Sequence, residues 1–402
     1  MSRNLPDWIN GFMSLTEDSE PPINFRKWVA ISTVASALQR KIKFELGLSI
    51  TIYPNLYVVL VGPPATGKGT AMGFAEDIIN KVPSIKISAQ ATSLQALIKN
   101  LKETNLTDLN KETGGMIFHS SLTVFSNEFT VFLGYHNSEL IATLCDWFDC
   151  KEKWTYDTIK RGKEEIRGVW VNILAGTTHE SLQASFPMEA IGGGLSSRII
   201  FVNEYKKGKD VILPNMTESQ LTLQHCLIRD LEQISMLSGV YKTTENALGT
   251  YYDWCIRSIN NPPFQDKKFD AYIGRRRVHL LSLAMICAAS RSDKLIIEQQ
   301  DMERSIQLIE EVEINMGTVF RGIGKSDISG ILGDALAFFE NSIDSNIPLH
   351  MFYRRFEGDV DKLMMDRMLN TLEQSNYIRV IKRPDMDTVI KILDKDKVDD
   401  SK

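Results

Sequence analysis

The sequence predicts an α/β fold in which a five-stranded parallel sheet is covered by helices on both faces. A helical region and a smaller domain follow the sheet along the chain. Three features of the 402-residue chain support this prediction. An apolar strand runs into the glycine-rich stretch GPPATGKGT (62–70), and a helical pattern follows at once. Further apolar strands then alternate with helical segments as far as about residue 205. Such alternation is typical of parallel sheets, because each crossover helix carries the chain back to the same end of the sheet.

The elements of this sheet follow from apolar, β-branched and aromatic runs. The expected strands are 51–62, 84–89, 121–128, 168–178 and 198–204. The expected helices around them are 25–42, 70–82 and 92–103. In the first helix apolar residues recur at helical spacing, Pro83 ends the second, and Thr92 or Ser93 caps the third.

The composition of the chain changes near residue 206. From there to residue 322 the pattern is helical, and its clearest helix begins at the arginines of RRRVHLLSLAMICAASRS (275–292). The stretch GIGKSDISG (322–330) is rich in glycine and serine, which predicts a hinge. Three short helical patterns and two strands around a Pro-Asp turn follow, as expected for a winged helix. The sequence thus predicts an N-terminal helical segment, a core containing the sheet, a helical lid and a winged-helix domain, at 1–56, 57–205, 206–322 and 326–395.

Charge and cysteine content exclude several classes of protein. A formal net charge of −5 argues against a uniformly basic nucleic-acid coat, so contacts with DNA have to come from local basic clusters. The five cysteines form no CxxC pair and show no metal-ligand spacing, as is usual for free thiols in a reducing cytoplasm. The N-terminus lacks the apolar core of a secretory signal, and the longest apolar run, 280–289, is too short to span a bilayer. We therefore expect a cytoplasmic protein with no membrane partner.

The stretch GPPATGKGT has the spacing of a phosphate-binding loop. Glycines let backbone N–H groups close around phosphate oxygens at a helix N-terminus, and the lysine after the second glycine reaches the β- and γ-phosphates of ATP or GTP. Most such loops carry Ser or Thr after the lysine, but this chain has Gly69. Thr70 is therefore the expected ligand of Mg²⁺, either directly or through a water. The residues expected to bind ATP are Gly62, Pro63, Pro64, Ala65, Thr66, Gly67, Lys68, Gly69 and Thr70.

A catalytic carboxylate is expected at the end of strand 121–128. Glu128 could polarise the water that attacks the γ-phosphate. The alternative is that Glu128 only caps the helix that follows. Asn127 stands where Asp is commoner, and it could orient a magnesium-bound water without adding negative charge.

Polar residues at two further strands complete the predicted site. Thr177 and Thr178 end strand 168–178, where they could hold the attacking water or simply cap the strand. Arg198 begins the fifth strand after a glycine-rich turn, and we expect it to reach outward to a neighbouring subunit. An arginine supplied in this way stabilises the charge on the transferring phosphoryl group. The alternative is a solvated surface arginine.

Three arginines open the main helix of the lid. Arg275, Arg276 or Arg277 could contact the γ-phosphate from there. Neighbours on a helix do not share a face, so one of them is expected to be functional. The other two would lie at the surface or touch DNA.

The stretch WTYDTIKRGKEEIRG (154–168) predicts a β-hairpin with a basic tip. Lys160, Arg161 and Lys163 lie at that tip. In a ring-shaped assembly, such a hairpin can point into the central channel and bind the phosphates of single-stranded DNA by charge. The alternative is a solvated hairpin tip.

The order of these motifs resembles the MCM-type hexameric AAA+ helicases and, more closely, the primase-associated helicase-like ATPases of phages and mobile elements. The resemblance covers about residues 25 to 320 and is carried by GPPATGKGT, SNE, the basic hairpin, AGTT, GLSSR and GRRR, with a consistent but generic winged helix. It implies a P-loop AAA+ core and a homo-oligomeric ring, a hexamer, that uses ATP and Mg²⁺ to translocate on single-stranded DNA during replication.

The resemblance also implies roles for individual residues. It places Lys68 at the phosphates, makes Glu128 the catalytic glutamate and Thr177 or Thr178 the sensor, and makes Arg198 the finger supplied to a neighbour. Gly69 and Asn127 depart from the family pattern at the positions that bear on metal ligation. A primase would have to be a separate chain, and for a phage protein the compartment would be the host cytoplasm.

Other functions remain open. A helicase loader or another DNA-dependent ATPase would share every nucleotide-site residue, but it would bind a partner helicase and would not depend on the hairpin. An adenylate-kinase-like phosphotransferase shares the GKGT ending, yet such enzymes carry the loop near the N-terminus, and here about 60 residues precede it. A nonenzymatic DNA-binding regulator would use the basic residues of the winged helix and leave the ATP site inert. Those basic residues are Arg354, Arg355, Lys382 and Arg383.

Overall fold

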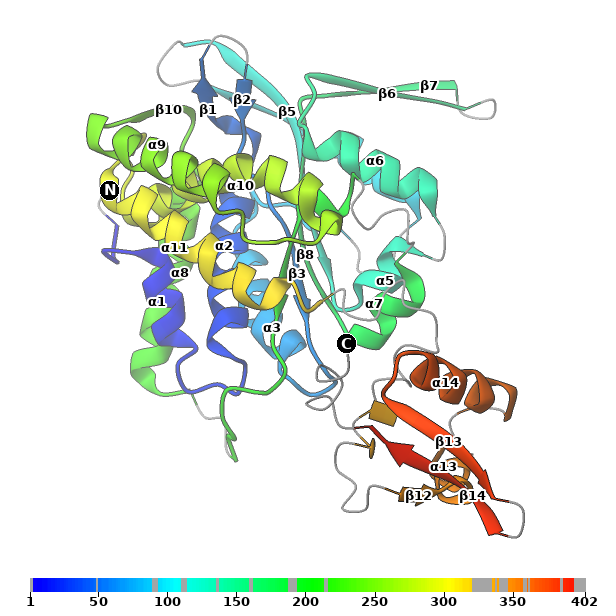
Figure 1. Cartoon of the computed structure of the whole chain (residues 1–402). Helices are drawn as coiled ribbons and strands as arrows, with labels where there is room; N and C mark the ends of the chain where they lie inside the picture. Colours follow the sequence, from blue (N-terminus) through cyan, green and yellow to red (C-terminus); the bar gives the residue numbers. More distant parts are fainter. Residues whose placement is uncertain are drawn as a thin grey trace. The chain divides into compact units, whose positions relative to one another are not determined.

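The chain folds as an α/β protein with two compact units, Met1–Arg321 and Gly322–Lys402 (Figure 1). Each unit has its own core of buried apolar side chains. The computed structural model describes residues 3–47, 50–88, 93–109, 114–134, 137–158, 162–186, 194–212, 216–319, 335–336, 338–339, 346–356, 360, 362–383 and 386–393.

The main sheet of the first unit has five strands in the order β4-β5-β8-β3-β9. They are β3 (Tyr57–Val61), β4 (Asn105–Leu109), β5 (Met116–Ser126), β8 (Val169–Thr177) and β9 (Ile199–Asn203). The strands β5, β8, β3 and β9 run parallel, so their carboxyl ends lie at one edge of the sheet. Every residue of β3, β8 and β9 is buried, as expected for apolar strands that are covered on both faces.

The main sheet is mixed, which corrects the prediction of five parallel strands. The edge strand β4 pairs antiparallel with the first residues of β5, which begins at Met116 rather than at Ser121. The segment 84–89, predicted as a strand, contributes a single bridge between Ile87 and Thr123. The sequence of β4, NLTDL, alternates between exposed and half-buried positions and has no apolar run. A polar edge strand of this kind gives no periodic apolar signal.

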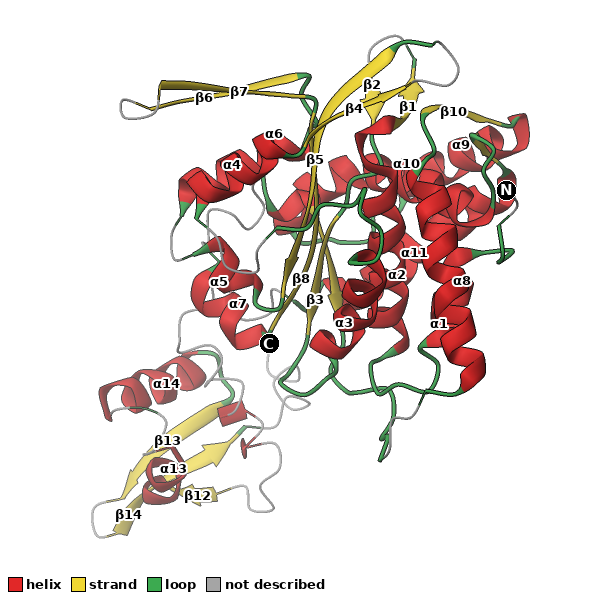
Figure 2. Cartoon of the chain, turned by 180° about the vertical axis from the view of Figure 1, so that it is seen from behind, coloured by secondary structure: helices red, strands yellow, loops and turns green. Residues whose placement is uncertain are grey.

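Helices cover both faces of the main sheet, as predicted (Figure 1, Figure 2). One face carries α2 (Ile23–Leu38) and α3 (Lys68–Ile79), and the other carries α4 (Leu94–Glu103), α5 (Phe129–Leu133), α6 (Ser138–Phe148) and α7 (His179–Ser185). Ser93 is the N-cap of α4, since its hydroxyl accepts a hydrogen bond from the N–H of Ala96 at 3.2 Å. Across the described residues, no helix combines the length and apolarity needed to cross a membrane.

A second sheet joins the N-terminal segment to the predicted lid. Its order is β11-β10-β1-β2, with β1 (Ile42–Leu46), β2 (Ile50–Ile52), β10 (Gly239–Thr243) and β11 (Ile296–Ile297). The short strands β10 and β11 lie where the sequence predicts only helices. Further helices of the first unit are α1 (Trp8–Leu15), α8 (Glu218–Ser235), α9 (Glu245–Asn260), α10 (Asp270–Arg291) and α11 (Gln299–Met316), and α10 packs against β2 and β11 of this sheet. They share one apolar core with α2 and α3, so the first three predicted segments form a single unit.

The predicted β-hairpin is present and extends away from the body of the first unit (Figure 1). Its strands are β6 (Lys153–Thr158) and β7 (Gly162–Arg167). At its base, Trp154 packs edge-on against Trp147 of α6, with ring centroids 5.4 Å apart. Lys163 is exposed on β7, whereas Lys160 and Arg161 lie outside the described residues.

The C-terminal unit contains helices and a small antiparallel sheet. Its elements are β12 (Asn346–Pro348), α13 (Leu349–Phe356), α14 (Lys362–Gln374), β13 (Ile378–Arg383) and β14 (Met386–Ile392), with the strand order β12-β14-β13. The two predicted strands are confirmed, and β12 is an additional strand too short to show a periodicity. The described residues of the first predicted helix, 335–336 and 338–339, are helical. The predicted hinge at 322–330 and the Pro-Asp turn lie outside the described residues.

Candidate nucleotide-binding site

The glycine-rich loop connects the carboxyl end of β3 to the N-terminus of α3. Gly67 has φ +87°, a conformation that favours glycine, and forms the N-cap of α3 without offering a side chain to it. Gly62 is tightly enclosed, because a Cβ there would lie 2.5 Å from the carbonyl oxygen of Glu204. Its N–H donates to the carbonyl of Thr177 at 3.3 Å, which ties the loop to the end of β8. Both glycines are therefore required by the path of the backbone.

The ammonium group of Lys68 lies inside the loop. Its Nζ donates to the carbonyl oxygens of Gly62 at 2.7 Å and Pro63 at 2.9 Å. Burial lowers the pKa of Lys68, and the carboxylates of Glu128 and Glu180 act in the opposite direction. A lysine ammonium group that is partly withdrawn from water attracts an anionic oxygen more strongly than one at the open surface.

Glu128 lies beyond the end of β5 and is held by two hydroxyl groups. Its Oε1 accepts hydrogen bonds from Thr177 at 2.8 Å and from Thr130 at 3.0 Å. Glu128 occupies the N-cap position of the short helix α5, but its side chain caps no backbone N–H group. The geometry therefore does not support the alternative in which this carboxylate serves only as a helix cap.

Gly69 and Asn127, the two residues that depart from the usual pattern of such sites, lie beside each other. A Cβ added to Gly69 would be 3.8 Å from Oδ1 of Asn127, an ordinary van der Waals contact. Gly176 of β8 lies close to both the end of β5 and the loop: a Cβ there would lie 3.2 Å from the carbonyl oxygen of Asn127 and 3.6 Å from Cβ of Lys68. The loop, the end of β5 and the end of β8 thus approach one another closely at one edge of the sheet.

The residues at this edge fit a nucleotide phosphate with Mg²⁺. The first N–H groups of α3 have no partner within the helix, and Gly67 supplies no side-chain cap, so they can bind phosphate oxygens. Thr70 is exposed in the first turn of α3, where its hydroxyl can face a metal ion or its water shell. Among the described residues, no three His, Cys, Asp or Glu side chains are grouped to hold a metal ion alone. Mg²⁺ usually takes only one or two protein ligands beside phosphate and water, so the site meets that need.

The second threonine of the pair has a structural role. Thr178 is the N-cap of α7, since its hydroxyl accepts from the N–H of Ser181 at 3.1 Å. Of the two predicted sensor residues, it is therefore Thr177, the last residue of β8, that contacts Glu128, whereas Thr178 caps the helix that follows.

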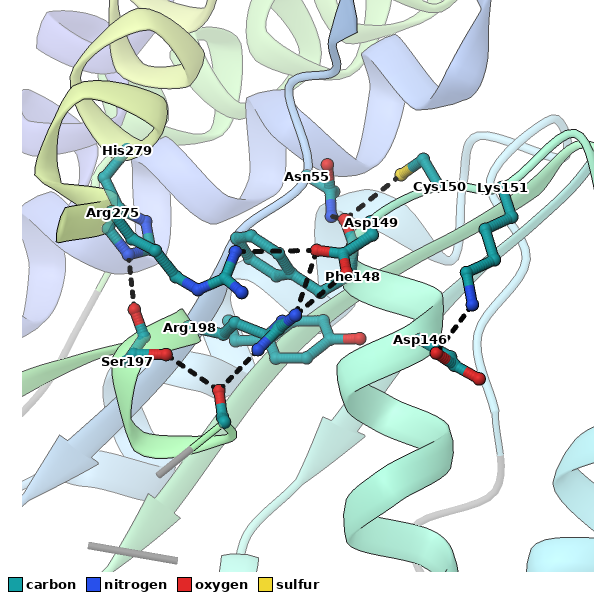
Figure 3. A network of polar contacts seen from close by, with 12 residues as sticks. Asn55, Asp146, Phe148, Asp149, Cys150, Lys151, Ser197, Arg198, Arg275 and His279 are labelled. Carbon is teal, nitrogen blue, oxygen red and sulfur yellow. Dashed lines mark hydrogen bonds and ion pairs between the residues drawn. The ribbon is translucent and has the colours of Figure 1, made fainter. Parts of the chain in front are cut away.

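Arg198 does not reach outward in the single chain, contrary to the sequence expectation. Its side chain is only 7% exposed, and Nη2 donates to the two carboxylate oxygens of Asp149 at 3.1 and 2.9 Å (Figure 3). Arg198 precedes Ile199, which pairs with Tyr57 at the start of the loop strand. At about 3.3 Å per strand residue, the loop begins roughly 17 Å further along. Arg198 therefore cannot touch a nucleotide bound to its own loop.

The three lid arginines have different surroundings. Arg275 is half-buried, and its Nη1 lies 3.6 Å from the same Asp149 (Figure 3). Arg276 is buried, pairs with Glu313 of α11 at 2.6 Å and stacks on Trp254, so its predicted contact with ATP is wrong. Arg277 is exposed. Arg275 lies beside Arg198 at the end of the sheet remote from the loop, so it too is out of reach of its own nucleotide site.

Three residues near these sites were not predicted from the sequence. Thr130 orients Glu128 by a hydrogen bond, and the only feature of the sequence that points to it is its position two residues after Glu128. Glu180 lies in the first turn of α7, where it interacts electrostatically with Lys68, and its pKa is lowered chiefly by its own backbone N–H group. Asp149 accepts both Arg198 and Arg275, and nothing in the pattern around it distinguishes it from a surface aspartate.

No family model matches the chain, and no curated protein is significantly similar to it. A functional conclusion therefore depends on the arrangement of Lys68, Glu128 and Thr177.

Proposed function

We propose that the protein is an ATPase that works as a ring-shaped DNA helicase or translocase of the AAA+ type, with ATP sites between subunits. The observation that carries the proposal is the meeting of Lys68, Glu128 and Thr177 at the carboxyl edge of one parallel sheet. Ligands of open parallel sheets bind at this edge, because loops and helix N-termini converge there.

The chemistry assigned to each residue follows from its contacts. Lys68 would bind the β- and γ-phosphates in place of the loop carbonyls that it now contacts. Glu128, whose orientation is fixed by two hydroxyl groups, would accept a hydrogen bond from the attacking water and polarise it. Thr70 and Asn127 would hold Mg²⁺ directly or through its water shell, and the ion would supply positive charge to the phosphate oxygens. Arg198 would serve the nucleotide of a neighbouring subunit, because its own loop lies too far away.

The remaining parts of the chain fit the same proposal. The hairpin β6–β7 extends from the first unit and carries exposed Lys163, so it is the proposed contact with the backbone of single-stranded DNA. The helices α8 to α11 would form the lid of the AAA+ core. The C-terminal unit, with helices followed by a β-ribbon, would be a winged helix.

Two substitutions test the ATP site separately for binding and chemistry. Lys68→Ala should lose nucleotide binding, because the cation inside the loop is removed. Glu128→Gln should still bind ATP but hydrolyse it about 10²- to 10⁴-fold more slowly, the usual contribution of a general base. Equilibrium binding of a fluorescent ATP analogue and steady-state phosphate release measure the two effects. Hydrolysis at the wild-type rate by Glu128→Gln would refute the catalytic assignment.

A further inference from the structure

Arg198 and Arg275 converge on one carboxylate, that of Asp149 (Figure 3). Arg198 ends the short 3-10 helix η3 (Ser196–Arg198), Arg275 lies on α10, and Asp149 is the C-cap of α6. Three elements far apart in the sequence thus place two cations against one anion. The cluster has an excess of one formal positive charge.

The two guanidinium groups have more donors than Asp149 uses. Nη1 of Arg198 donates to the carbonyl of Gly194 at 2.7 Å, but its buried Nε has no hydrogen-bond partner. Nη1 of Arg275 lies 3.6 Å from Asp149, which is an ion pair but not a hydrogen bond. Each guanidinium carries five N–H donors in a fork that fits phosphate as well as carboxylate oxygens. The pair can therefore satisfy an anion with more oxygens than a carboxylate has.

The other titratable groups around the cluster do not replace Asp149. Burial lowers the pKa of His279 to about 4, so this ring is neutral at pH 7. Burial raises the pKa of the Cys145 thiol, which stays protonated. Asp146 is paired with Lys151 at 2.7 Å instead. Among the described residues, Asp149 is the anion in direct contact with the two arginines.

The carboxylate and one arginine form the open side of the cluster. The side chain of Asp149 is 41% exposed and that of Arg275 is 32% exposed, whereas Arg198 lies beneath them. An anion that arrives from solvent therefore meets the position of Asp149 first. Since the loop of the same chain lies at the other end of the sheet, a nucleotide phosphate at this place has to belong to another molecule.

The geometry points to a phosphate-binding site at which Asp149 occupies the place of the anion. Asp149 is the internal counter-ion of Arg198 and Arg275, and it is displaced by the terminal phosphate of the neighbouring copy's nucleotide that the proposed function already assigns to Arg198. The inference rests on the proposed function, which supplies the neighbour's nucleotide. Before a neighbouring subunit binds, Asp149 pairs with Arg198 and Arg275 within the chain. The strength of this pairing determines how easily the neighbour's phosphate takes the place of Asp149.

The first test measures anion binding without any need for hydrolysis. Asp149→Asn and the control Asp146→Asn, a carboxylate near the end of the same helix, are each made in a Lys68→Ala background that disables the loop. Thermal melting is followed in inorganic phosphate and in potassium chloride of equal ionic strength. Asp149→Asn should gain about 3 °C or more in phosphate, as expected when a ligand binds only the folded state. An equal response of the two variants would overturn the inference.

A double variant covers the case in which Asp149→Asn is poorly folded. Two unbalanced guanidinium groups repel each other, so phosphate should rescue folding of Asp149→Asn where chloride does not. Asp149→Asn/Arg275→Gln has one cation fewer and should fold in either salt, without a response to phosphate. If Asp149→Asn remains unfolded in both salts, or if the double variant keeps the phosphate response, the inference is wrong.

Mixed assemblies separate this inference from the proposed function. A Lys68→Ala chain offers the arginine pair but no working loop, and an Arg198→Ala chain offers the loop without the pair. Placing Asp149→Asn in the Lys68→Ala chain should lower the KM of the mixture for ATP several-fold. Asp149→Asn placed in the Arg198→Ala chain, which already lacks one arginine of the pair, should leave the KM for ATP unchanged. An unchanged KM when Asp149→Asn is in the Lys68→Ala chain would refute the counter-ion role.

If the wild type hydrolyses no ATP, the proposed function fails. The phosphate-dependent melting then still decides whether the arginine pair is an anion site.

Discussion

At the scale of single residues, the orientation of Glu128 depends on hydroxyl groups from two different elements. Thr177 ends β8 and Thr130 lies in α5, and both donate to the same carboxylate oxygen. Thr177→Val keeps the shape of the side chain but removes the donor. A hydrogen bond to a charged group contributes about 1.5–3 kcal/mol, so we expect kcat for ATP hydrolysis to fall roughly 10- to 100-fold.

Thr178→Val is the matched control for this prediction. Thr178 caps α7 and does not contact Glu128, so its loss should lower the free energy of unfolding by about 1 kcal/mol and leave kcat nearly unchanged. Steady-state hydrolysis and urea unfolding of both variants measure the difference. Equal losses of kcat in the two variants would show that Thr177 has no particular role.

The proximity of Gly69 and Asn127 leads to a second prediction for single residues. A side chain at position 69 has room, since its Cβ would meet only Oδ1 of Asn127 at 3.8 Å. Gly69→Ser should therefore fold and should add a hydroxyl ligand for Mg²⁺. We expect the Mg²⁺ concentration for half-maximal hydrolysis to fall several-fold.

Gly73→Ser is the control for the metal effect, because Gly73 lies on the same helix with nothing within 4 Å of an added Cβ. The same dependence on Mg²⁺ in both variants would contradict the idea that position 69 faces the metal.

At the scale of secondary-structure elements, one buried ion pair joins α10 to α11. Arg276 pairs with Glu313 at 2.6 Å and also donates to Ser258 of α9. Removing one partner of a buried pair leaves an uncompensated charge, so Arg276→Ala should lower the free energy of unfolding by about 3–5 kcal/mol. Arg277→Ala, at the exposed neighbouring position, should change it by no more than about 0.5 kcal/mol. Chemical denaturation compares the two, and similar losses would rule out the structural role of Arg276.

The sequence predicts some of these elements well and others poorly, for physical reasons. Long apolar strands such as β3 and β8, and the glycine loop between β3 and α3, carry strong local patterns. The strand β4 is short and polar, and β10 and β11 are short and pair with strands far away in the sequence, so no local pattern marks them. The same reason applies to the candidate site. Lys68 and Glu128 stand in motifs, whereas the contact between Asp149 and Arg198 depends on the tertiary fold.

At the scale of the whole molecule, the distance between the loop and the arginine pair bears directly on function. Lys68 and Arg198 lie at opposite ends of neighbouring strands of one sheet, so a single chain cannot bring both to one nucleotide. If Arg198 takes part in hydrolysis, the complete site has to form between two copies of the chain. A ring in which every subunit gives its loop to one neighbour and its arginines to the other meets this condition.

The measurement that tests the proposed function most directly is steady-state ATP hydrolysis with and without single-stranded DNA. It compares the wild type with Lys160/Arg161/Lys163→Ala at the hairpin, and with Lys99/Lys102→Ala on α4 as a control for lost positive charge. We expect DNA to stimulate hydrolysis by the wild type and the control, and the hairpin variant to lose that stimulation while it keeps its basal rate. Hydrolysis that is indifferent to DNA in all three proteins would contradict the account of a DNA translocase.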